Sequence, residues 1–123
     1  MTTQSKHEGA SCDKLLSSLG LCARARALIC GTPMICEALR LTKPPVLVIE
    51  ASDTSDNTHK RLTDKCQFYH VTHIRIPAAA DELGRAVGKK TAVAAVALRD
   101  ESFVRLLQPQ LEALGLAARA NNA

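Results

Sequence analysis

The stretch VLVIEA, residues 46–51, decides the fold class of this 123-residue chain. Its apolar residues follow one another without the alternation that a sheet with one solvated face requires, so the pattern predicts a strand buried on both faces. Such a strand needs a layer of helices on each side of its sheet. We therefore expect an α/β fold, a three-layer α/β/α sandwich with a central mixed sheet of about four strands.

Helical and strand patterns alternate on both sides of this stretch. Thr32 is the expected N-cap of one helix, with Pro33 at its first position, and Gly88 is placed like the C-terminal cap of another. The predicted order is helix 11–26, strand 27–30, helix 33–41, strand 46–51, helix 58–69, strand 71–77, helix 81–88, strand 91–98 and a last helix that carries Phe103, Leu106 and Leu107 inward.

Length and composition predict one domain with short ends, since domains typically hold ~100 to 200 residues. Residues 1–10 are polar and aperiodic, so we expect a disordered arm there and the domain over residues 11–108. Pro109 can break the last helix, which leaves residues 109–123 as an Ala-rich tail. No apolar run approaches the ~20 residues of a membrane span, so we expect a cytoplasmic protein with no membrane partner.

The five cysteines are odd in number and contain no close Cys-x-x-Cys pair. We expect reduced thiols in small-residue surroundings rather than a zinc ribbon or a redox site. They lie at positions 12, 22, 30, 36 and 66.

Carboxylates near the end of the buried strand are the first candidates for catalysis. Asp53 follows the strand, where open α/β sheets place ligands, and Asp56 and Asp64 are close in sequence. Because this loop leads into a helix, capping is the favoured role for such residues. The chain contains no dinucleotide-binding motif, no P-loop motif and no nucleophile-elbow motif. We expect no catalytic residues and no cofactor.

Cys66, His70 and His73 are spaced so that a thiolate and an imidazole could meet near one helical turn. A fourth ligand is missing, and histidines near a helix end are explained by solvent exposure or by the helix dipole. We expect no metal site from this group.

Basic residues gather at two predicted element ends, although the net charge is only +4. Arg24 and Arg26 precede one helix, and Arg85, Lys89 and Lys90 surround a glycine-marked helix end. If these ends converge, they form a cationic face that suits phosphate. One Tyr, two Phe and no Trp make stacking on single-stranded bases unfavourable, and no basic recognition helix for DNA is present. Structured RNA is the nucleic acid that remains.

Three segments of the chain resemble one known family in order and spacing. They are LGLCARARALICGTPMICEALR (19–40), VLVIEASDTSDNTHKRLTDKC (46–66) and DELGRAVGKKTAVAAVAL (81–98). Together they resemble the kink-turn RNA-binding ribosomal proteins and their small bacterial relatives of the YlxQ type, over about residues 13–107. The motifs ASDTSDNT, DKC and ELGRAVGK carry most of the resemblance.

The resemblance implies a protein without enzymatic activity that binds structured RNA, typically at a kink-turn, with several family members acting in the ribosome. It places the RNA face on three element ends, to which we add Arg26 for its charge. The implied contacts are Gly31, Thr32, Pro33, Met34 and Glu37 in the first segment, Asp53 and Ser55 in the second, and Gly88, Lys89, Lys90, Thr91, Ala92 and Val93 in the third.

Three positions depart from the family pattern. Many kink-turn binders carry Asn and then Glu at the positions of Pro33 and Met34, where they read tandem G·A pairs, and Lys at the position of Glu37. Phosphate contacts through the glycine-led helix start and the lysines do not depend on those base readers. We take binding of structured RNA, with ribosomal RNA as one candidate, as the leading function. A protein-interaction module that uses the helix start at Pro33, Met34 and Ile35 is the alternative.

Overall fold

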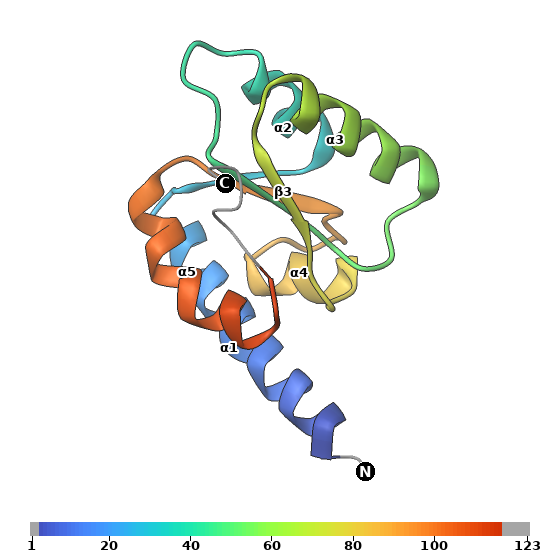
Figure 1. Cartoon of the computed structure of the whole chain (residues 1–123), viewed down its shortest axis with the longest axis vertical. Helices are drawn as coiled ribbons and strands as arrows, with labels where there is room; N and C mark the ends of the chain where they lie inside the picture. Colours follow the sequence, from blue (N-terminus) through green and yellow to red (C-terminus); the bar gives the residue numbers. More distant parts are fainter. Residues whose placement is uncertain (1–2, 117–123) are drawn as a thin grey trace.

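The computed structural model describes the backbone of residues 3–116 and the side chains of residues 12–116. Within this range, five helices and a four-stranded mixed sheet alternate along the chain (Figure 1). The elements are α1 (Thr3–Arg24), β1 (Leu28–Cys30), α2 (Thr32–Leu39), β2 (Leu47–Glu50), α3 (Asp56–Phe68), β3 (Thr72–Arg75), α4 (Ala80–Ala86), β4 (Ala95–Leu98) and α5 (Glu101–Ala113).

The strands lie in the order β1-β4-β2-β3. Strand β4 is antiparallel to both β1 and β2, whereas β3 is parallel to β2. Consequently β1, β2 and β3 all end at the end of the sheet where β4 begins. We call this end of the sheet, marked by Cys30, Glu50, Arg75 and Ala95, the carboxyl end.

Helices cover both faces of the sheet, as the apolar stretch around β2 predicts. Helices α1, α4 and α5 lie on one face, and α2 and α3 lie on the other (Figure 1). Leu47 and Ile49 of β2 pack with the first group of helices, and Val48 packs with the second. All three side chains are fully buried. The α/β/α sandwich with a mixed four-stranded sheet is confirmed.

Helix α1 is longer than its apolar spacing predicts. Its backbone is helical from Thr3, so it includes residues 3–10, where we expected a disordered arm. This stretch contains no proline, and a helix that is already nucleated gains one hydrogen bond for each residue added. Among the described helices, none is long and apolar enough to cross a membrane.

The last helix differs from its prediction in length and in its buried face. Helix α5 continues through Pro109 to Ala113, past the point where the tail was expected to begin. Leu107 and Leu111 are fully buried on one helical face, and this packing offsets the helix-breaking tendency of the proline. Leu106 is 47% exposed, so its predicted inward position is wrong. Of the predicted tail, residues 117–123 lie outside the described part of the chain.

Candidate nucleic-acid interface

Three predicted segments meet at the carboxyl end of the sheet. The N–H of Gly31 donates to the carbonyl of Ala95 at 2.9 Å, which joins the start of α2 to the start of β4. On the other side of β4, the N–H of Ala51 donates to the carbonyl of Ala94 at 2.8 Å. The start of α2, the loop after β2 and the 88–94 loop before β4 therefore form one surface.

The start of α2 presents the positive end of a helix to solvent. Gly31 is the N-cap at φ 93°, a conformation that favours glycine, and Pro33 lies in the first turn as predicted. Thr32 is not the N-cap, and its Oγ1 atom is buried without a partner among the described atoms. Met34 is 60% exposed, and Glu37 is also exposed on this helix. The first N–H groups of a helix have no intrahelical acceptor and suit an anion.

The 88–92 segment carries two lysines and leads to β4, whose start is joined to that helix start. Gly88 has φ 80° and ends α4 in the manner of a C-terminal glycine, as predicted. Lys89 and Lys90 are exposed, and neither forms an ion pair with another described side chain. Burial raises the pKa of the Cys30 thiol at the end of β1, and the nearby Lys89 ammonium offsets part of that rise.

The rest of this loop divides into exposed and buried residues. Thr91 and Ala92 are exposed. Val93 is 7% exposed and packs in the core, and its N–H donates to the carbonyl of Ala80 at 3.0 Å. Val93 was expected to contact RNA, but its side chain and its N–H are engaged in anchoring the loop to α4.

The loop after β2 uses its polar side chains to hold helices. Asp53 Oδ1 accepts a hydrogen bond of 2.8 Å from the N–H of Ala80 at the start of α4. Ser55 Oγ accepts one of 3.1 Å from the N–H of Thr58 and caps α3. The sequence favoured helix capping over catalysis as the role of Asp53. The helix that Asp53 caps is α4, however, and not α3, which follows Asp53 in the chain. Asp53 and Ser55 thus position the surface through these hydrogen bonds.

Arg26 does not lie on this surface. It precedes β1, and the carbonyl of the next residue, Ala27, accepts from the N–H of Arg99, just after β4. Arg26 is therefore at the opposite end of the sheet from Gly31. Arg26 was expected on the RNA face because of its charge, but β1 separates it from Gly31 in space.

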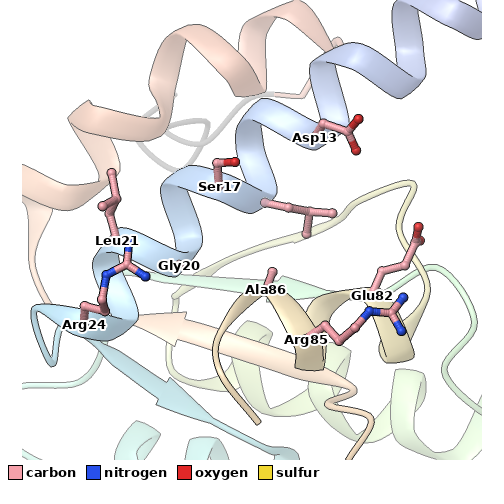
Figure 2. Close-up of a pocket in the computed structure, with 9 residues that line it drawn as sticks. Asp13, Ser17, Gly20, Leu21, Arg24, Glu82, Arg85 and Ala86 are labelled. Carbon is pink, nitrogen blue, oxygen red and sulfur yellow. The ribbon is translucent and has the colours of Figure 1, made fainter. Parts of the chain in front are cut away.

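Arg24 and Arg85 lie on a different part of the molecule. They line a groove of about 620 Å³ between α1 and α4 (Figure 2). Asp13 and Glu82 line the same groove, so its charge is mixed. The two groups of basic residues therefore do not converge on one cationic face, and only the lysines of the 88–92 segment belong to the loop that leads to the carboxyl end.

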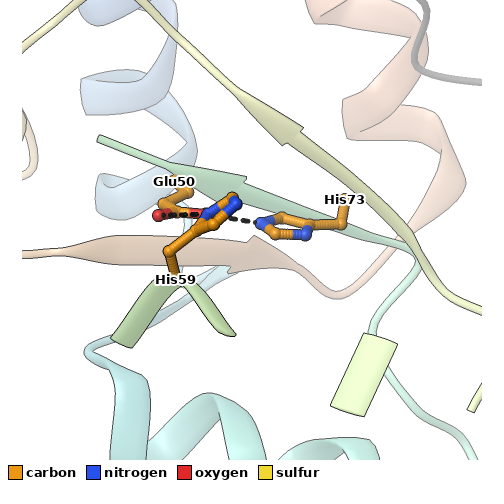
Figure 3. Close-up of side chains that lie close together, drawn as sticks. All are labelled: Glu50, His59 and His73. Atoms are coloured by element: carbon orange, nitrogen blue, oxygen red, sulfur yellow. Dashed lines mark hydrogen bonds and ion pairs between the residues drawn. The ribbon is translucent and has the colours of Figure 1, made fainter. Parts of the chain in front are cut away.

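A buried ionic cluster at the end of β2 was not anticipated from the sequence. Glu50 is fully buried, and it accepts hydrogen bonds from His59 Nδ1 at 2.8 Å and from His73 Nε2 at 2.7 Å (Figure 3). The hydroxyl of Thr54 donates to its other oxygen, and Arg75 Nε lies 3.6 Å from that oxygen. The feature of the sequence that could have indicated this cluster is Glu50, the one charged residue in the apolar stretch 46–51. His59 and His73 lie on the two elements that follow.

These contacts decide the ionisation of Glu50. Burial alone raises the pKa of a carboxyl group, because the charged form loses its hydration. Hydrogen bonds from Thr54, His59 and His73 outweigh the burial, and the pKa of Glu50 is lowered from its ordinary value. Glu50 is therefore a buried carboxylate that accepts hydrogen bonds from side chains of α3, of β3 and of the loop between β2 and α3.

The residues that were weighed for catalysis and metal binding, and not favoured for either, are distributed over separate environments. Cys66 lies on the buried face of α3, in the core shared with α2, and burial raises its pKa to about 12. His70 is exposed at φ 57°, whereas His73 contacts Glu50. The side chain of Asp64 pairs with Lys60 along α3 at 3.0 Å. In the described part of the chain, the group with metal-binding spacing contains His73 but neither Cys66 nor His70.

Comparison with known proteins agrees with this architecture. The chain is 37% identical over 89 residues to the RNA-binding protein YlxQ of Bacillus subtilis (strain 168), covering 72% of this chain and 86% of that protein. An Enterococcus faecium RNA-binding protein YlxQ is 28% identical over 99 residues, or 80% of this chain and 92% of the relative.

Solved structures extend the comparison to the fold. A Bacillus halodurans protein of unknown function superposes with a TM-score of 0.71 at 35% identity, over 80% of this chain and 97% of the other. The Giardia lamblia 15.5kD RNA binding protein has the same fold, with a TM-score of 0.68 at 18% identity over 86% and 88% of the two chains. Residues 13–107 match the ribosomal protein L7Ae/L30e/S12e/Gadd45 family, and the chain belongs to that family.

Proposed function

We propose that this chain is a non-catalytic protein that binds structured RNA through its carboxyl-end surface, which comprises residues 31–34, Glu37 and residues 88–92. The observation that carries the proposal is an exposed helix N-terminus joined at the start of β4 to a loop that carries two exposed lysines. The named activity of the YlxQ relatives supports the same class of ligand.

The chemistry of this surface favours phosphate and shape over base edges. Backbone N–H groups and ammonium groups bind phosphate oxygens without reading sequence. Pro33 and Met34 have no side-chain donor or acceptor for a purine edge, and Glu37 repels phosphate. The proposed ligand is therefore a folded RNA with a sharply bent backbone, such as a kink-turn, and structured ribosomal RNA belongs to this class. The five free thiols are consistent with a reducing compartment such as the cytoplasm.

The test removes two charges from the surface and, separately, two from the far end of the sheet. Lys89→Gln with Lys90→Gln should weaken binding to a kink-turn hairpin and to a straight duplex alike, by about tenfold. The log-log salt slope should fall by ~0.7 to 0.9 for each lost phosphate contact. Arg26→Gln with Arg99→Gln removes the same charge from the opposite end and should leave both RNAs bound nearly as well.

Fluorescence anisotropy at several salt concentrations measures both quantities. If the two double variants lose affinity and slope equally, net charge rather than this surface governs binding, and the proposed interface is wrong. Circular dichroism of each variant confirms that the fold is retained.

A protein partner is the second candidate, and one observation favours it. Met34 is 60% exposed at a helix start where a polar reader of RNA would be useful. Ile35 was expected to belong to this apolar contact surface, but it is fully buried. Only Pro33 and Met34 are exposed for a protein partner. In a crosslinking experiment, recovery of one protein through Met34 with RNA at background would favour this function over RNA binding.

A further inference from the structure

The cluster around Glu50 brings three potential metal ligands from three elements to one point. Glu50 is the last residue of β2, His59 lies in α3, and His73 lies in β3. One carboxylate oxygen and two ring nitrogens all lie within 4.8 Å of one another. The two imidazole rings face the carboxylate from different directions, with centroids 5.9 Å apart (Figure 3).

We propose that Glu50, His59 and His73 form a binding site for a divalent transition-metal ion of the zinc class. Two imidazoles and one carboxylate suit Zn²⁺ and its neighbours, whereas Mg²⁺ and Ca²⁺ prefer sites made of oxygen alone. Ligand atoms at ~2.0 to 2.2 Å from a tetrahedrally coordinated ion lie about 3.3 to 3.6 Å apart. The observed separations from Glu50 oxygens are 2.7 Å for His73 and 2.8 Å for His59, so small side-chain movements admit the ion.

The surroundings leave one side of the site accessible. Glu50 is fully buried and the His73 side chain is 13% exposed, but the His59 side chain is 42% exposed. His59 therefore provides a path for the ion and room for water in the remaining coordination position. Three protein ligands with an open position are typical of zinc sites that are not purely structural.

Binding requires the two ring nitrogens that face Glu50 to give up their protons. In the metal-free protein the ionised Glu50 can only accept, so His59 Nδ1 and His73 Nε2 carry the protons of these hydrogen bonds. To bind the ion, each neutral ring carries its proton on the other nitrogen and offers the freed lone pair. Thr54 keeps its hydrogen bond to the second carboxylate oxygen and orients it.

One neighbouring charge opposes the ion. Arg75 Nε lies 3.6 Å from the second oxygen of Glu50, and its Nη2 donates to Thr54 Oγ1 at 3.1 Å. Its side chain is 43% exposed, so the guanidinium can turn toward water when a cation binds. Arg75→Gln should therefore tighten metal binding. If the cluster served only as an ion pair, the same substitution would weaken it, because Glu50 would lose a cationic neighbour.

The experiment titrates the reduced full-length chain with Co²⁺ and Zn²⁺, because Co²⁺ reports its ligands by absorption. We expect one ion per chain, visible d–d bands without the near-ultraviolet band of cobalt thiolates, and a rise in Tm of about 5 °C or more at saturating Zn²⁺. His59→Ala and His73→Ala should each weaken binding by tenfold or more. His59 is half exposed on a helix, so alanine is tolerated there and the variant keeps its fold.

His70→Ala is the matched control, because this histidine is exposed and lies outside the cluster. It should bind Co²⁺ as the native chain does. Absence of binding at millimolar Co²⁺, a thiolate band, or an equal loss in the His70 and His59 variants would each overturn the proposal. Because the readout is metal binding, the result is independent of whether the chain binds RNA.

Discussion

Replacing Gly84 by alanine tests how the lysine-bearing loop is held against α4. A Cβ atom at this position would overlap the carbonyl oxygen of Thr91, and it would lie 3.2 Å from the carbonyl carbon of Thr91 and 3.3 Å from the Cα of Ala92. Nonbonded carbon atoms prefer separations of about 3.5 to 4.0 Å. Since the atoms in the way belong to the backbone, no side-chain rotation relieves the contact, and the loop must retreat by about 1 Å.

The energetic cost follows from what holds the loop in place. Two hydrogen bonds tie it to α4, from Lys89 N–H to Gly84 O at 2.9 Å and from Val93 N–H to Ala80 O at 3.0 Å. Straining them costs up to about 1 kcal/mol each, and overpacking costs about 1 to 3 kcal/mol. Alanine returns about 1 kcal/mol through its higher helix propensity. We expect the free energy of unfolding to fall by about 2 to 3 kcal/mol, which lowers Tm by roughly 8 to 12 °C.

Urea unfolding followed by circular dichroism measures this loss. Gly88→Ala is the control, because a Cβ there meets nothing within 4 Å and the only penalty is its φ of 80°. That penalty is about 1 to 2 kcal/mol. A Gly84→Ala chain as stable as the native one, or one no less stable than Gly88→Ala, would refute the close approach of the loop to α4. Weaker RNA binding by Gly84→Ala at temperatures where it remains folded would connect this packing to the proposed interface.

Two further predictions concern the surface and the thiols. Pro33→Asn, Met34→Glu and Glu37→Lys together should raise the preference for a kink-turn over a straight duplex by tenfold or more, since a bidentate base contact contributes about 1 to 3 kcal/mol of discrimination. Competition binding at one salt concentration measures the ratio, and an unchanged ratio would mean that this helix start does not approach the bases. In the folded chain, iodoacetamide should modify Cys30 well before Cys66, because Cys30 is partly exposed whereas burial raises the pKa of Cys66 to about 12. Peptide mass spectrometry follows the two rates, and equal rates would contradict the buried position of Cys66.

Local pattern in the sequence was sufficient for the layers of this fold. The unbroken apolar stretch around Val48 predicted a strand buried on both faces, and the structure places helices on both faces. Pro33 and Gly88 marked a helix start and a helix end because their backbone preferences are properties of the single residue. These preferences depend on a few neighbouring residues, so they can be recognised in the sequence even when the order of the strands in the sheet is unknown.

The tertiary structure decided which distant residues meet. Asp53 caps a helix that begins 27 residues later, and Arg26 lies at the opposite end of the sheet from the surface to which its charge had assigned it. Glu50 meets His59 and His73 only because β3 lies parallel beside β2 and α3 packs over both. Strand order and register arise from burial and hydrogen bonding summed over the whole chain, and no local pattern encodes them. The composition of the carboxyl-end surface and of the cluster around Glu50 was therefore decided by the fold rather than by any one segment.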